Sequence, residues 1–318
     1  GELGGNVARC VALMAGLPLA TAGTTINRLC GSSLQALAQA AHAIQAGAAD
    51  VQVVGGVEHM HHLPMEAAVD IHPRVLARSS RGMLSMGLTT EQLAAKHGIS
   101  RREQEEYARE SHARAAAAAA AGLFDDELVS VIGHDESGSV VEAWRDQSIR
   151  SDTSLEAMAR LEPVFLPKLG TVTAATSAPL SDGAAALVVM SEAEAGRQGL
   201  EPLARILATA VVGVPPAAMG TGPIAAVRRL LGRPAAAGIS LTDIDLVELN
   251  EAFAAQAIHC IRELGLDSGR VNVRGGSLAI GHPLGASGAR ITTTLLHALR
   301  YTRGRLGLAT MCIGLGQG

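Results

Sequence analysis

The chain has 318 residues, of which 48% are hydrophobic and 18% charged, and its formal net charge is −4. These values indicate a globular protein with a sizeable core, and they exclude a disordered chain. The negative net charge and the absence of a long run of basic residues also argue against nucleic-acid binding. Four widely spaced cysteines without a CxxC pair favour a reducing compartment, so we expect a cytoplasmic protein. We expect neither a transmembrane segment nor a secretory signal.

Short apolar segments alternate with helical patterns along the chain. Strands are expected at 51–54, 186–190, 203–212, 246–249 and 307–311. Helices are expected at 32–46, from a capping box at Ser100 to Gly122, after Ser191, and from Pro223. This alternation predicts a largely parallel sheet covered on both faces. Residues 59–180 break the pattern with a polar stretch, which we interpret as an inserted loop domain over the sheet.

Cys30 lies between a strand-like segment and the helix expected from Ser32. A thiol at a helix N-terminus faces unpaired amides and the positive end of the helix dipole, which favour the thiolate. A buried cysteine can equally be a small hydrophobic residue. Two further segments favour the nucleophile, because His282 and Cys312 also lie beside glycines that let backbone and substrate approach closely.

His282 is framed by glycines and a proline, directly before a helix expected near Ser287. Such a frame can hold an imidazole in one orientation, as a general base or an oxyanion donor requires, although a structural histidine would also fit. Asn250 lies where a strand ends and a helix begins, the usual edge for active sites in open α/β sheets. Its amide could cap the helix or position a water molecule.

Three histidines at positions 59, 61 and 62 suggest a metal site. Their spacing does not place three nitrogens around one ion, and no matching carboxylate or cysteine cluster lies nearby in the sequence. The glycine-rich segments match neither a phosphate-binding loop nor a dinucleotide-binding fingerprint. We therefore expect no metal and no bound cofactor.

Six segments together resemble the motifs of the thiolase family, in the same order along the chain. They are NRLCGSS at 27–33, GGVEHM at 55–60, SDGAAA at 181–186, NEAF at 250–253, GHPLG at 281–285 and CIGLGQG at 312–318. The first, second and last are most similar to the degradative 3-ketoacyl-CoA thiolases that form the β-subunits of bacterial fatty-acid oxidation complexes. The resemblance covers the chain from end to end.

The resemblance implies an α/β fold of two similar halves, packed as layered sheets and helices, with an inserted loop domain. The expected division is 1–58 with 181–192 for a truncated N-terminal half, 59–180 for the loop domain and 193–318 for the C-terminal half. Relatives have a strand-helix-strand unit before residue 1 and a further strand after Gly318, and we expect both to be missing here.

The implied activity is that of an acetyl-CoA C-acyltransferase in fatty-acid β-oxidation. It cleaves 3-ketoacyl-CoA with CoA into acetyl-CoA and a shortened acyl-CoA, and CoA is a substrate rather than a cofactor. Carried over by motif, Cys30 would be the acylated nucleophile, His282 would help to deprotonate it, and Cys312 would transfer protons to the enolate and from CoA.

The other carried-over roles concern stabilising groups and the substrate pocket. Asn250, through a water molecule, and His282 would stabilise the enolate oxygen, while the amides of Cys30 and Gly314 would form a second oxyanion hole. Met86 and Phe253 would be walls of the pocket. Residues 176–179 read TSAP where thiolases commonly have Asn-Ala-Ser-Gly, so the CoA-positioning serine of relatives is not carried over.

The resemblance also implies a homodimer and an association with the hydratase/3-hydroxyacyl-CoA dehydrogenase subunit of such a complex. Three alternatives stay open. A condensing ketoacyl synthase would pair its cysteine with two histidines, or with histidine and asparagine, and Cys312 argues against it. A biosynthetic acetoacetyl-CoA thiolase would share every catalytic residue. An inactive fragment or assembly subunit would lack thiolysis altogether.

Overall fold

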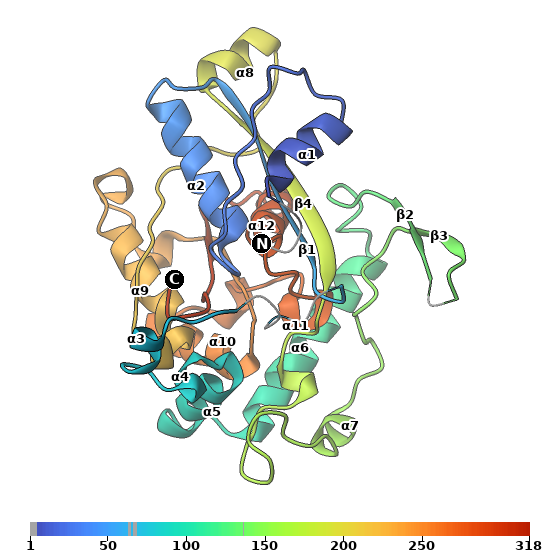
Figure 1. The fold of residues 1–318 in the computed structure, drawn as a ribbon, viewed down its shortest axis with the longest axis vertical. Coiled ribbons are helices and arrows are strands. Elements are labelled where there is room, and N and C mark those ends of the chain that lie inside the picture. The colour runs from blue at the N-terminus through green and yellow to red at the C-terminus, as the bar shows by residue number, and fades with distance from the viewer. Residues whose placement is uncertain (1–4, 63–64, 66–68, 136) are drawn as a thin grey trace.

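Two long antiparallel strands run through the middle of the computed structural model, which describes residues 5–62, 65, 69–135 and 137–318 (Figure 1). Strand β1 (Val51–His59) pairs along its whole length with β4 (Asp182–Met190), so that Val51 faces Met190 and His59 faces Asp182. Side chains alternate between the two faces of this ribbon. Val54 is 3% exposed on one face, whereas Val53 and Val188 are 59% and 61% exposed on the other.

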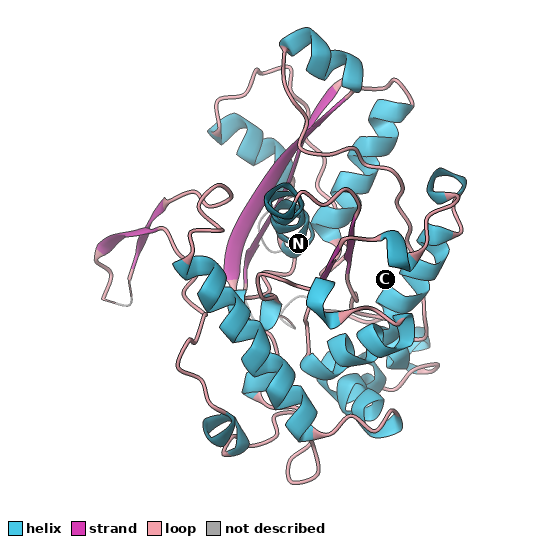
Figure 2. Ribbon diagram, turned by 180° about the vertical axis from the view of Figure 1, so that it is seen from behind, coloured by secondary structure: helices cyan, strands magenta, loops and turns pink. Residues whose placement is uncertain are grey.

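Helices α2 (Ser32–Gln45) and α12 (Ser287–Thr302) pack against this ribbon. Helix α12 also covers a short parallel pair, β5 (Leu246–Leu249) and β6 (Gly307–Thr310). It is therefore shared by the two sheets, and seen from behind it lies end-on between them (Figure 2).

The second half of the chain has its main core around β5 and β6. Their buried residues pack against α9 (Gly222–Leu231) and α10 (Ala254–Leu264) in a cluster that includes Val227, Val247, Leu249, Cys260 and Leu308. Strand β5 is buried at all four positions, as expected for a strand covered on both faces. Residues 250–253 follow its carboxyl end and are buried.

The chain between β1 and β4 forms a largely helical region below the ribbon (Figure 1). It contains α3 (Pro73–Leu76), α4 (Arg81–Leu84), α5 (Met86–Lys96), α6 (Arg101–Ala120), α7 (Leu155–Ala159) and the projecting hairpin of β2 (Val131–His134) with β3 (Val140–Ala143). Helix α6 lies across α10 and the short α11 (Ser277–Ile280), so this region is attached to the segment that precedes His282. Two more helices, α1 (Val7–Met14) and α8 (Glu192–Gln198), lie at the far end of the ribbon.

The local signals in the sequence are confirmed for the helices. Ser100 and Glu103 form the expected capping box, Ser191 caps α8, and α12 begins at Ser287. The first two depend on serine side chains that bond free amides in the first turn of their own helix, so neighbouring residues suffice to predict them, whereas α12 begins without a side-chain cap.

Two expectations about strands are wrong. The sheet is not largely parallel, because β1 and β4, the longest pair in the described part of the chain, run antiparallel. The strand expected at 203–212 is not formed within the described residues. Only Val212 at its end exchanges backbone hydrogen bonds, at 3.0 and 3.1 Å, with Gly318. Strand formation depends on a partner that the local apolar pattern does not specify.

None of the helices in the described ranges has the length and apolar character needed to cross a membrane.

Glu248 in the middle of β5 is a buried carboxyl group, 4% exposed. Burial raises its pKa from 4.5 to about 8, with a smaller opposing effect of Arg290. Between these values the folded protein holds a proton that the unfolded chain releases, so the contribution of Glu248 to stability decreases as pH rises. A shift of this size, from 4.5 to about 8, corresponds to an effect on the order of 5 kcal/mol.

We expect the free energy of unfolding of Glu248→Gln to decrease less between pH 5 and pH 8 than that of the wild type, because glutamine does not titrate. Thermal or denaturant unfolding of both proteins at several pH values would measure this slope. Glu192→Gln is the matched control, because this side chain is 81% exposed. An unchanged slope in Glu248→Gln would contradict the assignment.

Candidate active site

Three loops bring the candidate catalytic residues together. Cys30 precedes α2, Cys312 follows β6, and His282 lies between α11 and α12. Cys30, Met311 and Ile313 share one buried cluster, against which Leu284 also packs.

Two glycines permit this convergence. A β-carbon on Gly31 would lie 2.3 Å from Ile313 Cδ1, so a side chain there would displace the Ile313 side chain beside Cys312. A β-carbon on Gly56 in β1 would lie 2.2 Å from the carbonyl oxygen of Gly285. Glu58, two residues further along β1, accepts a hydrogen bond of 2.9 Å from the Gly285 amide. Strand β1 therefore supports the loop of His282.

Cys30 is 3% exposed, and its sulfur is hydrogen-bonded by the backbone amides of Gly314 and of Cys30 itself. Burial raises the pKa of the thiol to about 11, and the two amides only partly oppose this effect. The expectation that a helix N-terminus favours the thiolate is therefore wrong for this resting state. Helix α2 begins at Ser32, after its N-cap Gly31, and desolvation outweighs the two amides that bond the sulfur. Cys30 consequently needs a base to ionise it.

His282 is held through both ring nitrogens. Nδ1 lies 2.6 Å from Ser287 Oγ, which in turn lies 2.8 Å from the carbonyl oxygen of Pro283. That carbonyl can only accept, so the Ser287 hydroxyl donates to it and accepts from Nδ1–H. This direction leaves the proton on Nδ1 and a free lone pair on Nε2.

The side-chain amide of Asn250 faces the lone pair on His282 Nε2. Asn250 is 1% exposed, and its Nδ2 lies 3.2 Å from His282 Nε2. Its Oδ1 accepts a hydrogen bond of 2.6 Å from Ser277 Oγ, and its backbone amide bonds to Thr310 of β6. Asn250 therefore does not cap α10, which begins only at Ala254.

The imidazole of His282 is neutral. It is 5% exposed, and burial lowers its pKa to about 3, with a further lowering by the positive charge of Arg290. A neutral ring with an unprotonated Nε2 can accept a proton and later donate it as an imidazolium.

Cys312 is 1% exposed and packs with Val172, Met219, Ala252 and Phe253. Its pKa lies well above the usual value because of burial and, to a smaller extent, of the neighbouring Cys30 and Cys260. A thiol of this kind stays protonated and can protonate a strongly basic carbon.

Met86 and Phe253 lie beside these thiols, where the sequence predicts pocket walls. Met86 packs against the Cys312 cluster, and its sulfur would lie 3.7 Å from a β-carbon on Gly314. Phe253 makes an edge-on contact with Phe165, with ring centroids 5.8 Å apart. An apolar wall next to the thiols suits an acyl chain.

Comparison with known proteins identifies this arrangement. Residues 1–193 match the thiolase N-terminal domain family, and residues 200–318 match the thiolase C-terminal domain family. The chain belongs to the thiolase family.

Curated relatives include the 3-ketoacyl-CoA thiolases of Shewanella loihica and Aeromonas hydrophila. Each is 51% identical over all of this chain and 82% of the relative. Among solved structures, human mitochondrial 3-ketoacyl-CoA thiolase has a TM-score of 0.88 at 40% identity, covering 98% of this chain and 81% of the human chain. The acetyl-CoA acetyltransferase of Bacillus anthracis has a TM-score of 0.87, also at 40% identity and with the same coverage. The thiolase fold expected from the motifs is confirmed.

His59, His61 and His62, whose spacing in the sequence suggested a metal site, lie at the end of β1 and directly after it. His59 and His61 contact Asp182 of β4 at 3.3 and 3.2 Å, a carboxylate that the sequence reading did not anticipate near them. Within the described ranges, no three His, Cys, Asp or Glu side chains are grouped as around a metal ion.

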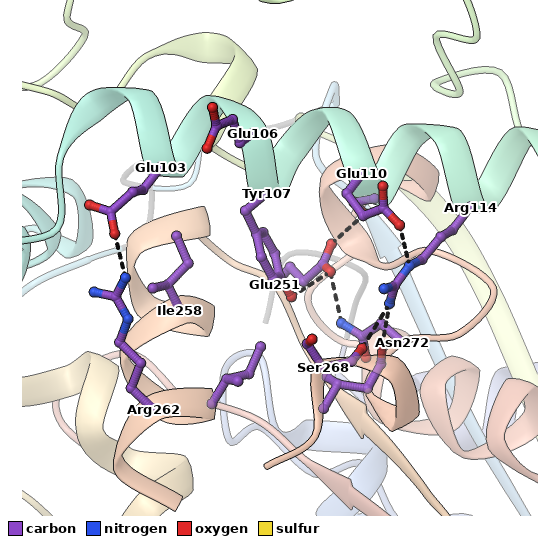
Figure 3. Close-up of a pocket in the computed structure, with 13 residues that line it drawn as sticks. Glu103, Glu106, Tyr107, Glu110, Arg114, Glu251, Ile258, Arg262, Ser268 and Asn272 are labelled. Carbon is purple, nitrogen blue, oxygen red and sulfur yellow. Dashed lines mark hydrogen bonds and ion pairs between the residues drawn. The ribbon is translucent and has the colours of Figure 1, made fainter. Parts of the chain in front are cut away.

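A groove between α6 and α10 adjoins the back of this thiolase site (Figure 3). There Glu251 accepts hydrogen bonds from Tyr107, Ser111 and Asn272 at 2.8–2.9 Å, and from the amide of Leu278 at 3.1 Å. These contacts tie the residue after Asn250 to α6 and α11. Sequence reasoning missed this support, although Glu251 belongs to the NEAF motif.

Several other residues near the site were also missed. Phe165, Val172 and Met219 contact the Cys312 cluster but lie in segments without a recognisable motif. Ser277, Ser287 and Arg290 lie in the glycine-rich segment around His282. Their polar character in a buried glycine-rich segment was the one available signal.

Proposed function

We propose that this chain is a 3-ketoacyl-CoA thiolase, an acetyl-CoA C-acyltransferase that cleaves 3-ketoacyl-CoA with CoA. The observation that carries the proposal is that Cys30, Cys312 and the neutral imidazole of His282 are all buried. The Gly314 amide also donates a hydrogen bond to the Cys30 sulfur. The names of the curated relatives support the same substrate class.

The first half-reaction acylates Cys30. His282 takes the thiol proton, and the thiolate attacks the 3-keto carbon, whose oxygen then accepts hydrogen bonds from the amides of Cys30 and Gly314. The Cα–Cβ bond breaks, and its electron pair forms the enolate of acetyl-CoA. The protonated His282 and a water molecule held by Asn250 stabilise the enolate oxygen. Cys312 gives its proton to the enolate carbon and becomes a thiolate.

The second half-reaction transfers the acyl group to CoA. The Cys312 thiolate takes the proton of the CoA thiol, and the resulting CoA thiolate attacks the thioester on Cys30. The same two amides stabilise the tetrahedral oxyanion. When the bond to Cys30 breaks, its sulfur takes back the proton from His282, so both thiols and the imidazole return to their starting state.

The setting of this reaction is part of the proposal. We infer a cytoplasmic enzyme of fatty-acid β-oxidation that forms a homodimer and associates with a hydratase/3-hydroxyacyl-CoA dehydrogenase subunit. We also retain the division into residues 1–58 with 181–192, residues 59–180 and residues 193–318. Support for the middle boundary comes from β1 and β4, since the intervening chain leaves and returns at one end of this pair.

The test is to incubate the chain with CoA and 3-ketoacyl-CoA substrates of different lengths. We expect equal amounts of acetyl-CoA and of an acyl-CoA shortened by two carbons, measured by mass spectrometry. Cleavage of long chains supports the degradative enzyme, whereas cleavage of acetoacetyl-CoA alone supports the biosynthetic alternative. A folded sample that releases no acetyl-CoA would overturn the proposal.

A further inference from the structure

Arg290 approaches the site from the first turn of α12 and reaches Asn250 through one intermediate residue. Its Nη2 lies 2.7 Å from Ser277 Oγ, and that oxygen lies 2.6 Å from Asn250 Oδ1. Ser277 and Asn250 are each 1% exposed. These contacts form a continuous chain from a guanidinium to the amide that faces His282.

The direction of each hydrogen bond in this chain follows from the donors available. A guanidinium can only donate, so Ser277 accepts from Arg290 and has a single proton left. That proton goes to Asn250 Oδ1, which leaves the Nδ2 group facing His282 Nε2. If the amide were flipped, Oδ1 would face the lone pair on Nε2, and two acceptors would oppose each other at 3.2 Å.

The positive charge of Arg290 is retained by its surroundings. Burial lowers its pKa, and the carboxyl groups of Asp146 and Glu251 act in the opposite direction. A charged donor forms a shorter and stronger hydrogen bond and polarises the hydroxyl that accepts it, which makes Ser277 a better donor to Asn250.

We propose that Arg290 and Ser277 are positioning residues that fix the orientation of the Asn250 amide, and thereby the donor group proposed to stabilise the enolate. Neither residue contacts the reacting atoms under this proposal. The inference rests on the proposed function of Asn250 in thiolysis. It adds the reason why Nδ2 of this amide, and not Oδ1, faces His282.

The test compares two reactions of the same enzyme. Thiolysis requires the enolate and therefore Asn250. Exchange of labelled CoA into an acyl-CoA requires only acyl transfer to Cys30 and back, and no enolate forms. We expect Arg290→Gln and Ser277→Ala to lower kcat for thiolysis about 10–100-fold with little change in KM. The exchange rate should stay within about threefold of the wild type, since the acyl-transfer residues are intact.

A variant that keeps one charged donor and a double-mutant cycle make the test specific. Arg290→Lys should recover part of the thiolysis that Arg290→Gln loses. In an Asn250→Ala background, Ser277→Ala should cause little further loss, because the group that it orients is already absent.

Arg274→Gln is the matched control, because Arg274 is a buried arginine that donates to the backbone carbonyls of Leu123 and His297 rather than to Ser277. If it disturbs the structure, it should lower both reactions together. Equal losses of thiolysis and exchange in Arg290→Gln and in Ser277→Ala would overturn the positioning role, as would additivity with Asn250→Ala. A wild-type protein with no exchange would instead refute the proposed function.

Discussion

Replacing Cys30 with alanine is expected to lower thiolysis at least about 10⁴-fold, because no other group can take the acyl chain. The sulfur of Cys30 accepts hydrogen bonds from the backbone amides of Gly314 and of Cys30 itself. Cys312 cannot replace it, since its sulfur is bonded by its own backbone amide and not by such a pair of amides. The fold should persist, because alanine keeps the apolar contacts of the β-carbon.

Acid quenching during turnover, followed by peptide mass spectrometry, would measure this directly. The wild type should carry an acyl mass on Cys30 that disappears on adding CoA, and Cys30→Ala should carry none. Cys10→Ala is the control, because this cysteine is exposed and lies in α1, outside the buried cluster of Cys30. Acylation at another residue, or full activity in Cys30→Ala, would refute the nucleophile assignment.

Replacing Cys312 with alanine is expected to lower thiolysis about 10²–10⁴-fold, the usual range for loss of a general acid and base. Its buried thiol is proposed to protonate the enolate carbon and then to take the proton of CoA. Alanine can do neither, so both half-reactions slow. The nucleophile, the imidazole and the oxyanion donors stay in place, which is why the loss should be smaller than that of Cys30→Ala.

Exchange of the methyl hydrogens of acetyl-CoA in deuterated water isolates this proton transfer. The wild type should incorporate deuterium, whereas Cys312→Ala should incorporate almost none. Cys260→Ala is the matched control, because Cys260 is equally buried but donates to the carbonyl of Gly220 and has no proposed role. Normal exchange in Cys312→Ala would show that another group carries the proton.

Local sequence was sufficient for features that neighbouring residues decide. The capping box of Ser100 and Glu103, the start of α12 at Ser287 and the buried strand β5 all agree with their sequence patterns. Six collinear motifs were sufficient for the family, and with it for the fold. They also indicated Cys30, His282 and Cys312, whose roles await the experiments above.

The tertiary structure decided what depends on distant partners. The antiparallel pairing of β1 with β4 joins segments separated by more than a hundred residues, and the failure of 203–212 to form a strand reflects the same dependence on a neighbour. The raised pKa of the Cys30 thiol arises from burial, which outweighs the two backbone amides that bond the sulfur. The tautomer of His282 and the orientation of Asn250 follow from Ser287, Ser277 and Arg290. The motifs thus determined which chemical groups the protein carries, whereas only packing determined their protonation and direction, because both depend on solvent exclusion and on partners brought together by the fold.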